Sequence, residues 1–315
     1  MRGVLLMAYG GPASLDQVEA YYTHIRRGTK PTKEQLDDLV ARYVAIGGGT
    51  PLLAITERQA AALELALKSR GGAKVFAGMK HSPPFVADVM AKAKAEGVTE
   101  LLCVALAPHY SGIGVGGYAR AVDEANSRLG GHFKVTFVKS WHDNPGLVSM
   151  WAGRIGEAAK SLGPDASVVF SAHSLPERVI REGDPYKSEL LETSDLVAKA
   201  AGLKDWTFAF QSQSKTGEPW LGPDLLDHLQ TLFDAGKRKF ISAPIGFVSD
   251  HLEVLYDIDV ECGGWAKERG AELVRCRSPN DSPEMVAALV QIAEANGFAQ
   301  AERHEAGNKV IIQTM

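Results

Sequence analysis

The sequence predicts an α/β protein made of two similar halves, each with a four-stranded parallel sheet flanked by helices. Two observations predict this fold class: short apolar runs recur along the 315-residue chain, and longer stretches with helical spacing separate them. Continuous apolar strands that alternate with helices are typical of parallel sheets covered on both faces. The HDNPGL segment marks the expected boundary, so the halves are 1–145 and 146–315, with a C-terminal helix that can pack back on the first half.

The expected strands fall into two sets of four, although no repeat is visible in the sequence itself. The spacing of Ser14 and Gln17 predicts a capping box that opens the first helix, which is expected to end near Arg27. The strands are expected at 3–8, 74–79, 100–107 and 134–138 in the first half, and at 167–172, 206–211, 240–245 and 272–276 in the second.

Composition and charge exclude several classes of protein. The net charge of −4 and the isoelectric point near 6.2 give no basic surface for a nucleic acid. No stretch approaches the ~20 apolar residues of a membrane span, and the apolar run at the N-terminus is too short for a signal peptide. Cys103, Cys262 and Cys276 are widely spaced, which favours a reducing cytosol over a disulfide framework. We therefore expect a cytoplasmic monomer without stable membrane insertion.

The segment 250–261, DHLEVLYDIDVE, combines acidic residues with a nearly continuous apolar surface. A helix that is apolar nearly all round is usually buried, and buried carboxylates are costly unless they are paired or bind a metal. Asp259 points away from the other acids on a helical wheel. Four acids fall within roughly 80° of one another, namely Asp250, Glu253, Asp257 and Glu261.

Polar side chains follow several expected strands at their carboxyl ends, where open parallel sheets bind ligands. Tyr9 follows the first strand, His81 the second and His173 the fifth. A lone histidine at a strand end is often structural, but the acidic segment begins just after a strand of the same half. Imidazole and carboxylate together suit a first-row divalent metal such as iron or zinc. One histidine beside a row of acids favours a metal that is handed on over a fixed structural site.

The spacing of the acids predicts what each can do. Glu253, Asp257 and Glu261 recur every four residues and would span about 12 Å along a helix, which is too long for one coordination shell. We expect Glu253 to be the inner ligand, and Asp257 and Glu261 to hold a second, more hydrated ion such as Mg²⁺. The alternative is that the two outer acids pair with basic side chains.

Two further motifs suggest other chemistry and find less support. GIGVGG at 112–117 matches a dinucleotide-binding pattern, but PHYS separates it from its strand and the next strand ends in Lys139 rather than an acid. The alternative is a glycine loop beside a ligand, with Tyr118 at the start of the following helix. The serine of SAHSLPE (171–177) is not in a GxSxG elbow, so serine hydrolysis lacks support.

Basic side chains gather in the first half of the chain. A cluster of this kind is often the solvated end of a helix, where cations complement the helix dipole. It can instead grip an anionic substrate, because guanidinium groups match carboxylates in shape and charge. The cluster consists of Arg26, Arg27, Lys30 and Arg42.

Taken together, the motifs closely resemble those of the ferrochelatases. They occur in the order MAYGGP, YYTHIRRG, RYVAIGGGTPL, GMKHSPPF, LAPHYS, SAHSLPE, QSQSKTGEPWLGPD and GFVSDHLEVLYDIDVE, from Tyr9 to Glu261, and family-like sequence continues to about residue 297. So many ordered motifs are far more specific than any one of them. The resemblance implies a chelatase-like fold of two Rossmann-like halves, a porphyrin cleft between them, and insertion of ferrous iron into the macrocycle.

The resemblance also implies roles for individual residues. His173 and Glu253 match the metal-binding, catalytic pair, and Tyr9 matches the residue that faces the other side of the macrocycle and can be an axial ligand in the product. His81 lies in the same cleft. Thr50 stands where a serine is more usual and keeps the hydroxyl group. The positions that contact the porphyrin and its propionates are Arg26, Arg42, Tyr43, Thr50 and Tyr118.

The resemblance is strongest to the soluble enzymes of Gram-positive-type bacteria, which metallate coproporphyrin III. Residues 29–45 are rich in charge and offer no apolar lip of the kind that membrane-associated protoporphyrin enzymes carry. Three separated cysteines argue against a [2Fe–2S] cluster. The resemblance therefore implies a lyase of haem biosynthesis with no permanently bound cofactor, in which Fe²⁺ is a substrate.

Several alternatives remain at this point. The porphyrin can be protoporphyrin IX, or the protein can insert cobalt or nickel into a related tetrapyrrole. A non-catalytic haem or iron carrier belongs to a different class and would bind product without turnover. If coproheme is the product, the resemblance implies a transient hand-over to the next haem-pathway enzyme, coproheme decarboxylase.

Overall fold

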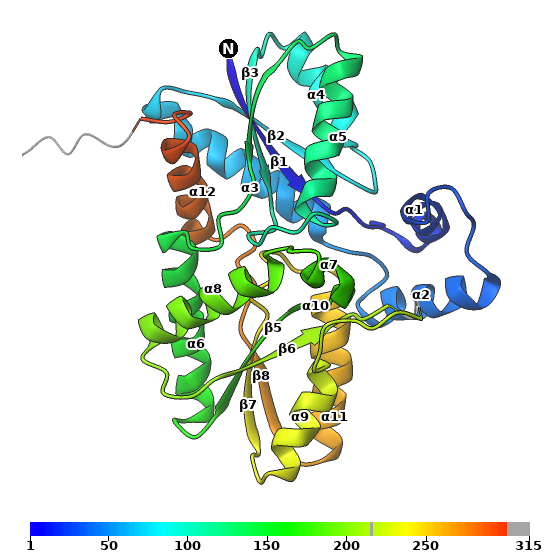
Figure 1. Ribbon diagram of the computed structural model, residues 1–315, viewed down its shortest axis with the longest axis vertical. Helices are drawn as coiled ribbons and strands as arrows, with labels where there is room; N and C mark the ends of the chain where they lie inside the picture. The colour runs from blue at the N-terminus through cyan, green and yellow to red at the C-terminus, as the bar shows by residue number, and fades with distance from the viewer. Residues whose placement is uncertain (215–216, 301–315) are drawn as a thin grey trace, which may run out of the picture.

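The computed structural model describes residues 1–214 and 217–300, and these form two four-stranded parallel sheets (Figure 1). The predicted fold class is confirmed. The part of the expected second half that follows residue 300 lies outside the described residues. The first sheet has the order β2-β1-β3-β4, from β1 (Arg2–Ala8), β2 (Lys74–Met79), β3 (Glu100–Ala105) and β4 (Lys134–Val138). The second has the order β6-β5-β7-β8, from β5 (Ser167–His173), β6 (Thr207–Gln211), β7 (Lys239–Ala243) and β8 (Glu272–Arg275).

Helices cover both faces of each sheet, and the alternation of strand residues shows which helix covers which face. Leu6 of β1 packs in a core with α3, whereas its neighbour Leu5 packs in another core with α4 and α5. In the second sheet, Phe170 of β5 faces α6 and α8, and Val169 faces α9, η3 and α11. The helices of the first half are α1 (Val18–Ile25), α2 (Lys33–Ala45), α3 (Leu52–Leu67), α4 (Val86–Ala95) and α5 (Val115–Arg128), with short turns η1 (Leu15–Gln17) and η2 (Lys68–Arg70). Those of the second half are α6 (Pro145–Leu162), α7 (Glu177–Arg181), α8 (Tyr186–Ala201), α9 (Leu225–Asp234), α10 (Leu252–Val254), η3 (Leu255–Cys262), α11 (Gly263–Glu268) and α12 (Pro283–Ala295).

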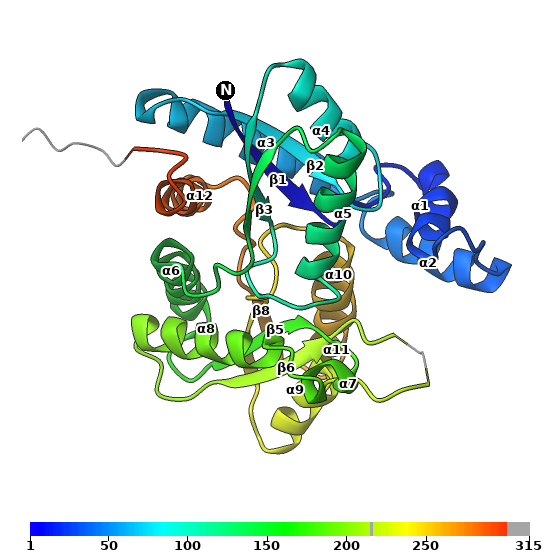
Figure 2. The ribbon, with the colours of Figure 1, turned by 45° about the horizontal axis from the view of Figure 1, so that its top comes forward.

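The largest core belongs to both halves at once. Helix α12 follows the last strand of the second sheet and lies against α3 of the first half as well as α6 (Figure 2). Leu63 of α3, Trp151 of α6 and Leu289 of α12 are each at most 1% exposed and belong to one continuous apolar cluster. Burial of a large apolar side chain stabilises a fold by about 1.5–3 kcal/mol. The two sheets are therefore joined by apolar packing as well as by the chain.

The predicted capping box at Ser14 is wrong. The Ser14 side chain makes no capping hydrogen bond, and Oε1 of Gln17 accepts from the backbone N–H of Ala13 at 3.0 Å instead. In the tight 3₁₀ turn of η1, the Gln17 side chain therefore reaches the N–H of Ala13, one residue before the Ser14 N–H that a capping box requires. The first helix does end beside Arg27, as expected, and a true capping box between Thr32 and Gln35 opens α2.

The acidic segment is not the regular buried helix that the sequence predicts. Its first helical residue is Leu252, so Asp250 precedes the helix and does not belong to the row of acids. From Leu255 to Cys262 the backbone forms a π-helix, a rare geometry that often marks functional sites. Only one face is buried, because the segment packs one side against the second sheet: Val254, Ile258 and Cys262 are at most 2% exposed.

No helix among residues 1–214 and 217–300 combines the length and the apolar character needed to cross a membrane.

Candidate active site

His173 and Glu253 meet although they come from different elements. His173 is the last residue of β5 and Glu253 lies in α10, and His173 Nε2 is 3.5 Å from Glu253 Oε1. Both side chains are about one-third exposed, at 29% and 33%. His173 Nδ1 donates to the backbone carbonyl of Ser174, since a carbonyl can only accept. This hydrogen bond leaves Nε2 directed at the carboxylate.

A second imidazole reaches the same carboxylate from the other side. His251 Nε2 lies 3.5 Å from Glu253 Oε2, and His251 Nδ1 donates to the Ser249 carbonyl at 2.9 Å. Metal-binding histidines commonly fix their orientation in this way, by donating the other ring N–H to a carbonyl. The sequence reasoning missed His251, although it stands only two residues before Glu253. Across residues 1–214 and 217–300, no three or more His, Cys, Asp or Glu side chains are arranged as a preformed metal cage.

The three groups hold one another in charged states. Burial alone would lower the pKa of His173, but the charge of Glu253 and the hydrogen bond to it outweigh burial and raise this pKa to about 9. Burial likewise favours neutral His251, but the hydrogen bond and the charge of Glu253 outweigh burial and raise the pKa of His251. In turn, the two imidazoles outweigh the burial of Glu253 and hold the pKa of this carboxyl well below its usual range. A divalent cation that enters must therefore displace protons from the imidazoles.

Asp257 and Glu261 follow Glu253 along the π-helix but are bound differently. Asp257 Oδ2 accepts from Ser212 Oγ at 2.5 Å and from Gln211 Nε2 at 3.5 Å. Burial raises the pKa of Asp257 to about 6 despite the bond from Ser212, and the charge of Glu253 adds to the rise. Burial also raises the pKa of the more exposed Glu261, against the charge of Arg42. Neither carboxylate forms an ion pair with a described basic side chain.

Tyr9 leaves the end of β1 and is 42% exposed. Burial, together with the charge of Glu253, raises the pKa of Tyr9 to about 12, so the phenol stays protonated. Its ring centroid lies 4.5 Å from that of His81 and 5.9 Å from Lys80 Nζ. The structure thus brings Tyr9 and His81 together, as the sequence predicts.

His81 belongs to a pair of histidines. Its Nδ1 lies 3.1 Å from Nδ1 of His24, and the His24 ring stacks on Phe85 with centroids 5.0 Å apart. Burial and the nearby charge of Lys80 lower the pKa of His81 to about 4, so this imidazole is neutral near pH 7. His24 was not predicted, because only the tertiary fold brings α1 beside the loop after β2.

The predicted porphyrin contacts differ in how far they are exposed. Arg42 of α2 lies 5.1 Å from the centre of the Tyr256 ring and pairs with Asp38 at 3.2 Å, so it reaches the π-helix from the first half. Arg26, at the end of α1, has no hydrogen-bond partner for its Nε among the described residues. Three other contacts lie deeper, at no more than 9% exposed: Tyr43, Thr50 and Tyr118.

The chain after β1 packs tightly over Thr50. A Cβ atom on Gly11 would lie 2.6 Å from Thr50 Cγ2, and this position requires glycine for that reason. Tyr118 stands in the first turn of α5, which begins at Val115, and Lys80 Nζ lies 5.1 Å from the centre of its ring. Lys80 thus links Tyr118, just after the glycine loop, to Tyr9.

The fold and the site together define the class. The sirohydrochlorin chelatase SirB from Bacillus subtilis subspecies spizizenii has the same fold, with a TM-score of 0.55 over 95% of this chain and 99% of that chain at 10% identity. The ferrochelatase family model matches residues 1–296. The ferrochelatase of Herpetosiphon aurantiacus is 45% identical over 90% of this chain and 95% of the relative. The coproporphyrin III ferrochelatase of Bacillus subtilis is 43% identical over 92% and 96%. This chain belongs to the ferrochelatase family, whose members are metal chelatases and hence lyases.

Proposed function

We propose that this protein inserts Fe²⁺ into coproporphyrin III to give coproheme. The observation that carries the proposal is the group of His173, Glu253 and His251, in which one carboxylate lies between two imidazoles whose Nε2 atoms face it. Relatives named coproporphyrin III ferrochelatase, 40–43% identical over most of the chain, support the choice of porphyrin. Imidazole nitrogen and carboxylate oxygen suit ferrous iron.

The metal side begins with proton loss from the imidazoles. Fe²⁺ takes the place of the proton between His173 and Glu253, and the carboxylate keeps the positive charge compensated. Asp257 and Glu261 supply weaker oxygen contacts further along the π-helix, where a hydrated ion such as Mg²⁺ or the next Fe²⁺ can wait. Because so few protein ligands hold the ion, it can move on to the four ring nitrogens.

On the porphyrin side, insertion exchanges one Fe²⁺ for two pyrrole protons. Once the metal has left it, His173 is a base with a pKa of about 9 in the pair with Glu253, so it can take up one of these protons. His251 Nε2, which faces the other oxygen of the Glu253 carboxylate, can take up the second proton. Tyr9 follows β1, stays protonated and is near enough to feel the charge of Glu253, so it can contact the ring from its other face.

The first half holds the macrocycle by its edges. Arg26 and Arg42 carry guanidinium groups suited to propionates, and the Nε of Arg26 is buried without a hydrogen-bond partner among the described residues. A macrocycle clamped at its edges can be bent at one pyrrole, which turns that nitrogen toward the incoming metal. Coproporphyrin III offers four propionates to this clamp and protoporphyrin IX offers two.

Anaerobic incubation with Fe²⁺ and either porphyrin, followed by absorbance, tests the proposal. Faster metallation of coproporphyrin III is expected. Faster turnover of protoporphyrin IX would contradict the assignment of coproporphyrin III as the substrate, while iron insertion would stand as the reaction. Parallel assays with Co²⁺ and Ni²⁺ separate the reaction from that of other chelatases. Tight binding of coproheme without any turnover would identify a carrier instead of an enzyme.

A further inference from the structure

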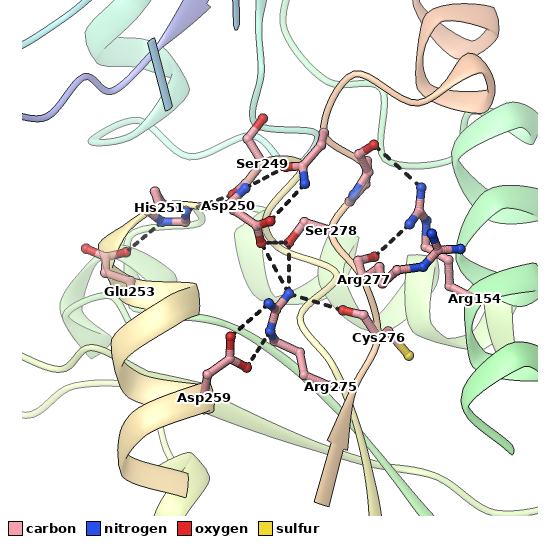
Figure 3. A network of polar contacts seen from close by, with 12 residues as sticks. Arg154, Ser249, Asp250, His251, Glu253, Asp259, Arg275, Cys276, Arg277 and Ser278 are labelled. Atoms are coloured by element: carbon pink, nitrogen blue, oxygen red, sulfur yellow. Dashed lines mark hydrogen bonds and ion pairs between the residues drawn. The ribbon is translucent and has the colours of Figure 1, made fainter. Parts of the chain in front are cut away.

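A single guanidinium joins two carboxylates of the metal-site segment, Asp250 just before α10 and Asp259 within η3 (Figure 3). Arg275, the last residue of β8, is 15% exposed at its side chain. Its Nε and Nη2 donate to both oxygens of Asp259 at 2.7 and 2.9 Å, and its Nη1 donates to Asp250 Oδ1 at 3.2 Å. Figure 3 shows Glu253 pointing away from this network, so Arg275 holds the segment from behind.

The Asp250 carboxylate is fully engaged. Besides Arg275, it accepts from Ser278 Oγ at 2.7 Å and from Asn280 Nδ2 at 2.8 Å, and the Asp250 N–H donates to Asn280 Oδ1 at 2.8 Å. Asn280 adopts a left-handed backbone conformation, with φ of 48°, that places its side chain for both bonds. A carboxylate with three donors is an anchor for the chain, in contrast to Glu253, whose side-chain partners among the described residues are two imidazoles.

The loop that carries these donors is itself fixed to the rest of the molecule. Gln59 of α3 donates to the Asn280 carbonyl at 2.6 Å, and Arg58 of α3 forms a forked ion pair with Asp281 at 2.7 and 3.2 Å. From α6, Arg154 donates to the Arg277 carbonyl at 3.0 Å. The anchor of the metal-site helix thus rests on helices of both halves.

We propose that Arg275 is a positioning residue for the metal site, which sets the place of Glu253 relative to His173. The inference rests on the proposed function. Arg275 and His173 end two strands of the same sheet, so a bond from Arg275 to the helix fixes the helix to the sheet that carries His173. The bond is needed because α10 has only three residues and the following π-helix is a less stable geometry than an α-helix.

The geometry of the contact explains why an arginine stands there. A planar guanidinium presents a fork to Asp259 and has a further N–H for Asp250 at the same time. A lysine would keep the charge but could not form the paired bonds to Asp259 while reaching Asp250. The Arg275→Lys change therefore keeps the positive charge and removes the paired bonds that position the segment.

The test compares Arg275→Lys and Asp259→Asn with Leu289→Ala. The first two disturb the Arg275 clamp, that is, the contacts of Arg275 with Asp250 and Asp259. The third weakens the buried core of α12 and leaves those contacts intact. Three quantities are measured on each full-length protein: Zn²⁺ affinity without porphyrin, the KM for Fe²⁺ in insertion, and coproporphyrin affinity. We expect Zn²⁺ affinity to fall, and the KM for Fe²⁺ to rise, by about 10- to 100-fold in both clamp variants, as when outer partners of metal ligands are lost, with unchanged porphyrin affinity.

Unchanged Zn²⁺ affinity in both clamp variants, with a melting temperature lowered as in Leu289→Ala, would show that Arg275 only stabilises the fold and would overturn the proposal. If Arg275→Lys does not fold, Asp259→Asn decides alone, because it keeps the Arg275–Asp250 bond. If the parent protein inserts no iron, the proposed function fails, but the Zn²⁺ measurement still shows whether Arg275 positions the site.

Discussion

His173 Nε2 and Glu253 Oε1 lie 3.5 Å apart in a site that neither the strand nor the helix could form alone. The strand β5 delivers the imidazole and α10 delivers the carboxylate, 80 residues later in the chain. His251 completes the group through the second carboxylate oxygen. This contact is the basis of the following predictions about metal binding.

His173→Ala should abolish iron insertion and leave coproporphyrin affinity nearly unchanged. Loss of a metal ligand removes several kcal/mol of transition-state stabilisation, because the ion no longer has a nitrogen ligand beside the carboxylate. The matched control is His228→Ala, a histidine of the same half on α9. Insertion rates are measured anaerobically, and a His173→Ala rate within about threefold of the parent would contradict the assignment.

Metal affinity should rise with pH up to about 9. The folded pKa of His173, about 9, lies above its ordinary value of 6.5, so the free site is protonated across this range and the cation must displace at least one proton. We expect Zn²⁺ affinity to gain about tenfold per pH unit between roughly pH 6.5 and 9, with proton release detectable by calorimetry in buffers of different ionisation enthalpy.

Glu253→Gln provides the control for this pH dependence. Without the charge of Glu253 the imidazole loses the cause of its raised pKa, so the plateau should move to lower pH while overall affinity falls. A Zn²⁺ affinity that does not change with pH in the parent would rule out the proton exchange.

Arg42→Ala should weaken coproporphyrin binding by ~1.5–3 kcal/mol, the range for a hydrogen bond to a charged group. The matched control is Lys33→Ala, which removes an i,i+4 ion pair with Asp37 from the other end of the same helix. Binding is followed by quenching of porphyrin fluorescence. Equal losses in the two variants would show that helix stability, rather than a propionate contact, is being measured.

Asp257→Asn should stabilise the fold at neutral pH while raising the KM for Fe²⁺. The folded pKa of Asp257, about 6, is above its ordinary value of 3.8, so its negative charge destabilises the fold above pH 6 and this penalty fades as pH falls toward 4. The gain in melting temperature should therefore be present near pH 7.5 and absent near pH 4.

Glu261→Gln is the companion change, since Glu261 is more exposed and its removal should affect metal dependence more than stability. An Fe²⁺ KM and a response to Mg²⁺ that both stay unchanged in the two variants would leave the outer acids without a role in metal supply. A rise in porphyrin KM instead would move these acids to the substrate contacts.

The sequence predicted the strands well, because a buried parallel strand needs a continuous apolar run. The ends depend on single residues: β7 was expected to reach 245 but stops at Ala243, since Pro244 has no N–H to continue the ladder. The π-helix could not be foreseen. Apolar residues four apart, such as Val254 and Ile258, fit an α-helical stripe equally well.

The site was predictable where a residue follows its own strand and hidden where tertiary contacts decide. His173 and Tyr9 stand at strand ends, and the rule for parallel sheets places both at the ligand side. Asp250 looks like one of four acids on the same side of a helical wheel, yet it precedes the helix and binds Arg275. His24 meets His81 only after folding, so no spacing in the sequence reveals it, whereas His251 stands two residues before its partner Glu253 and was simply missed.

The apolar cluster shared by α3, α6 and α12 limits how the molecule can move. A jaw-like opening of the two halves would pull Leu63, Trp151 and Leu289 apart and expose them to water, at about 1.5–3 kcal/mol for each. Helices α1 and α2 stand outside this cluster, at the side of the molecule (Figure 2). The proposed cleft between the halves would therefore keep its width, and we expect adaptation to a flat or a bent ring to fall to α1 and α2, where Arg26 follows α1 and Arg42 lies in α2.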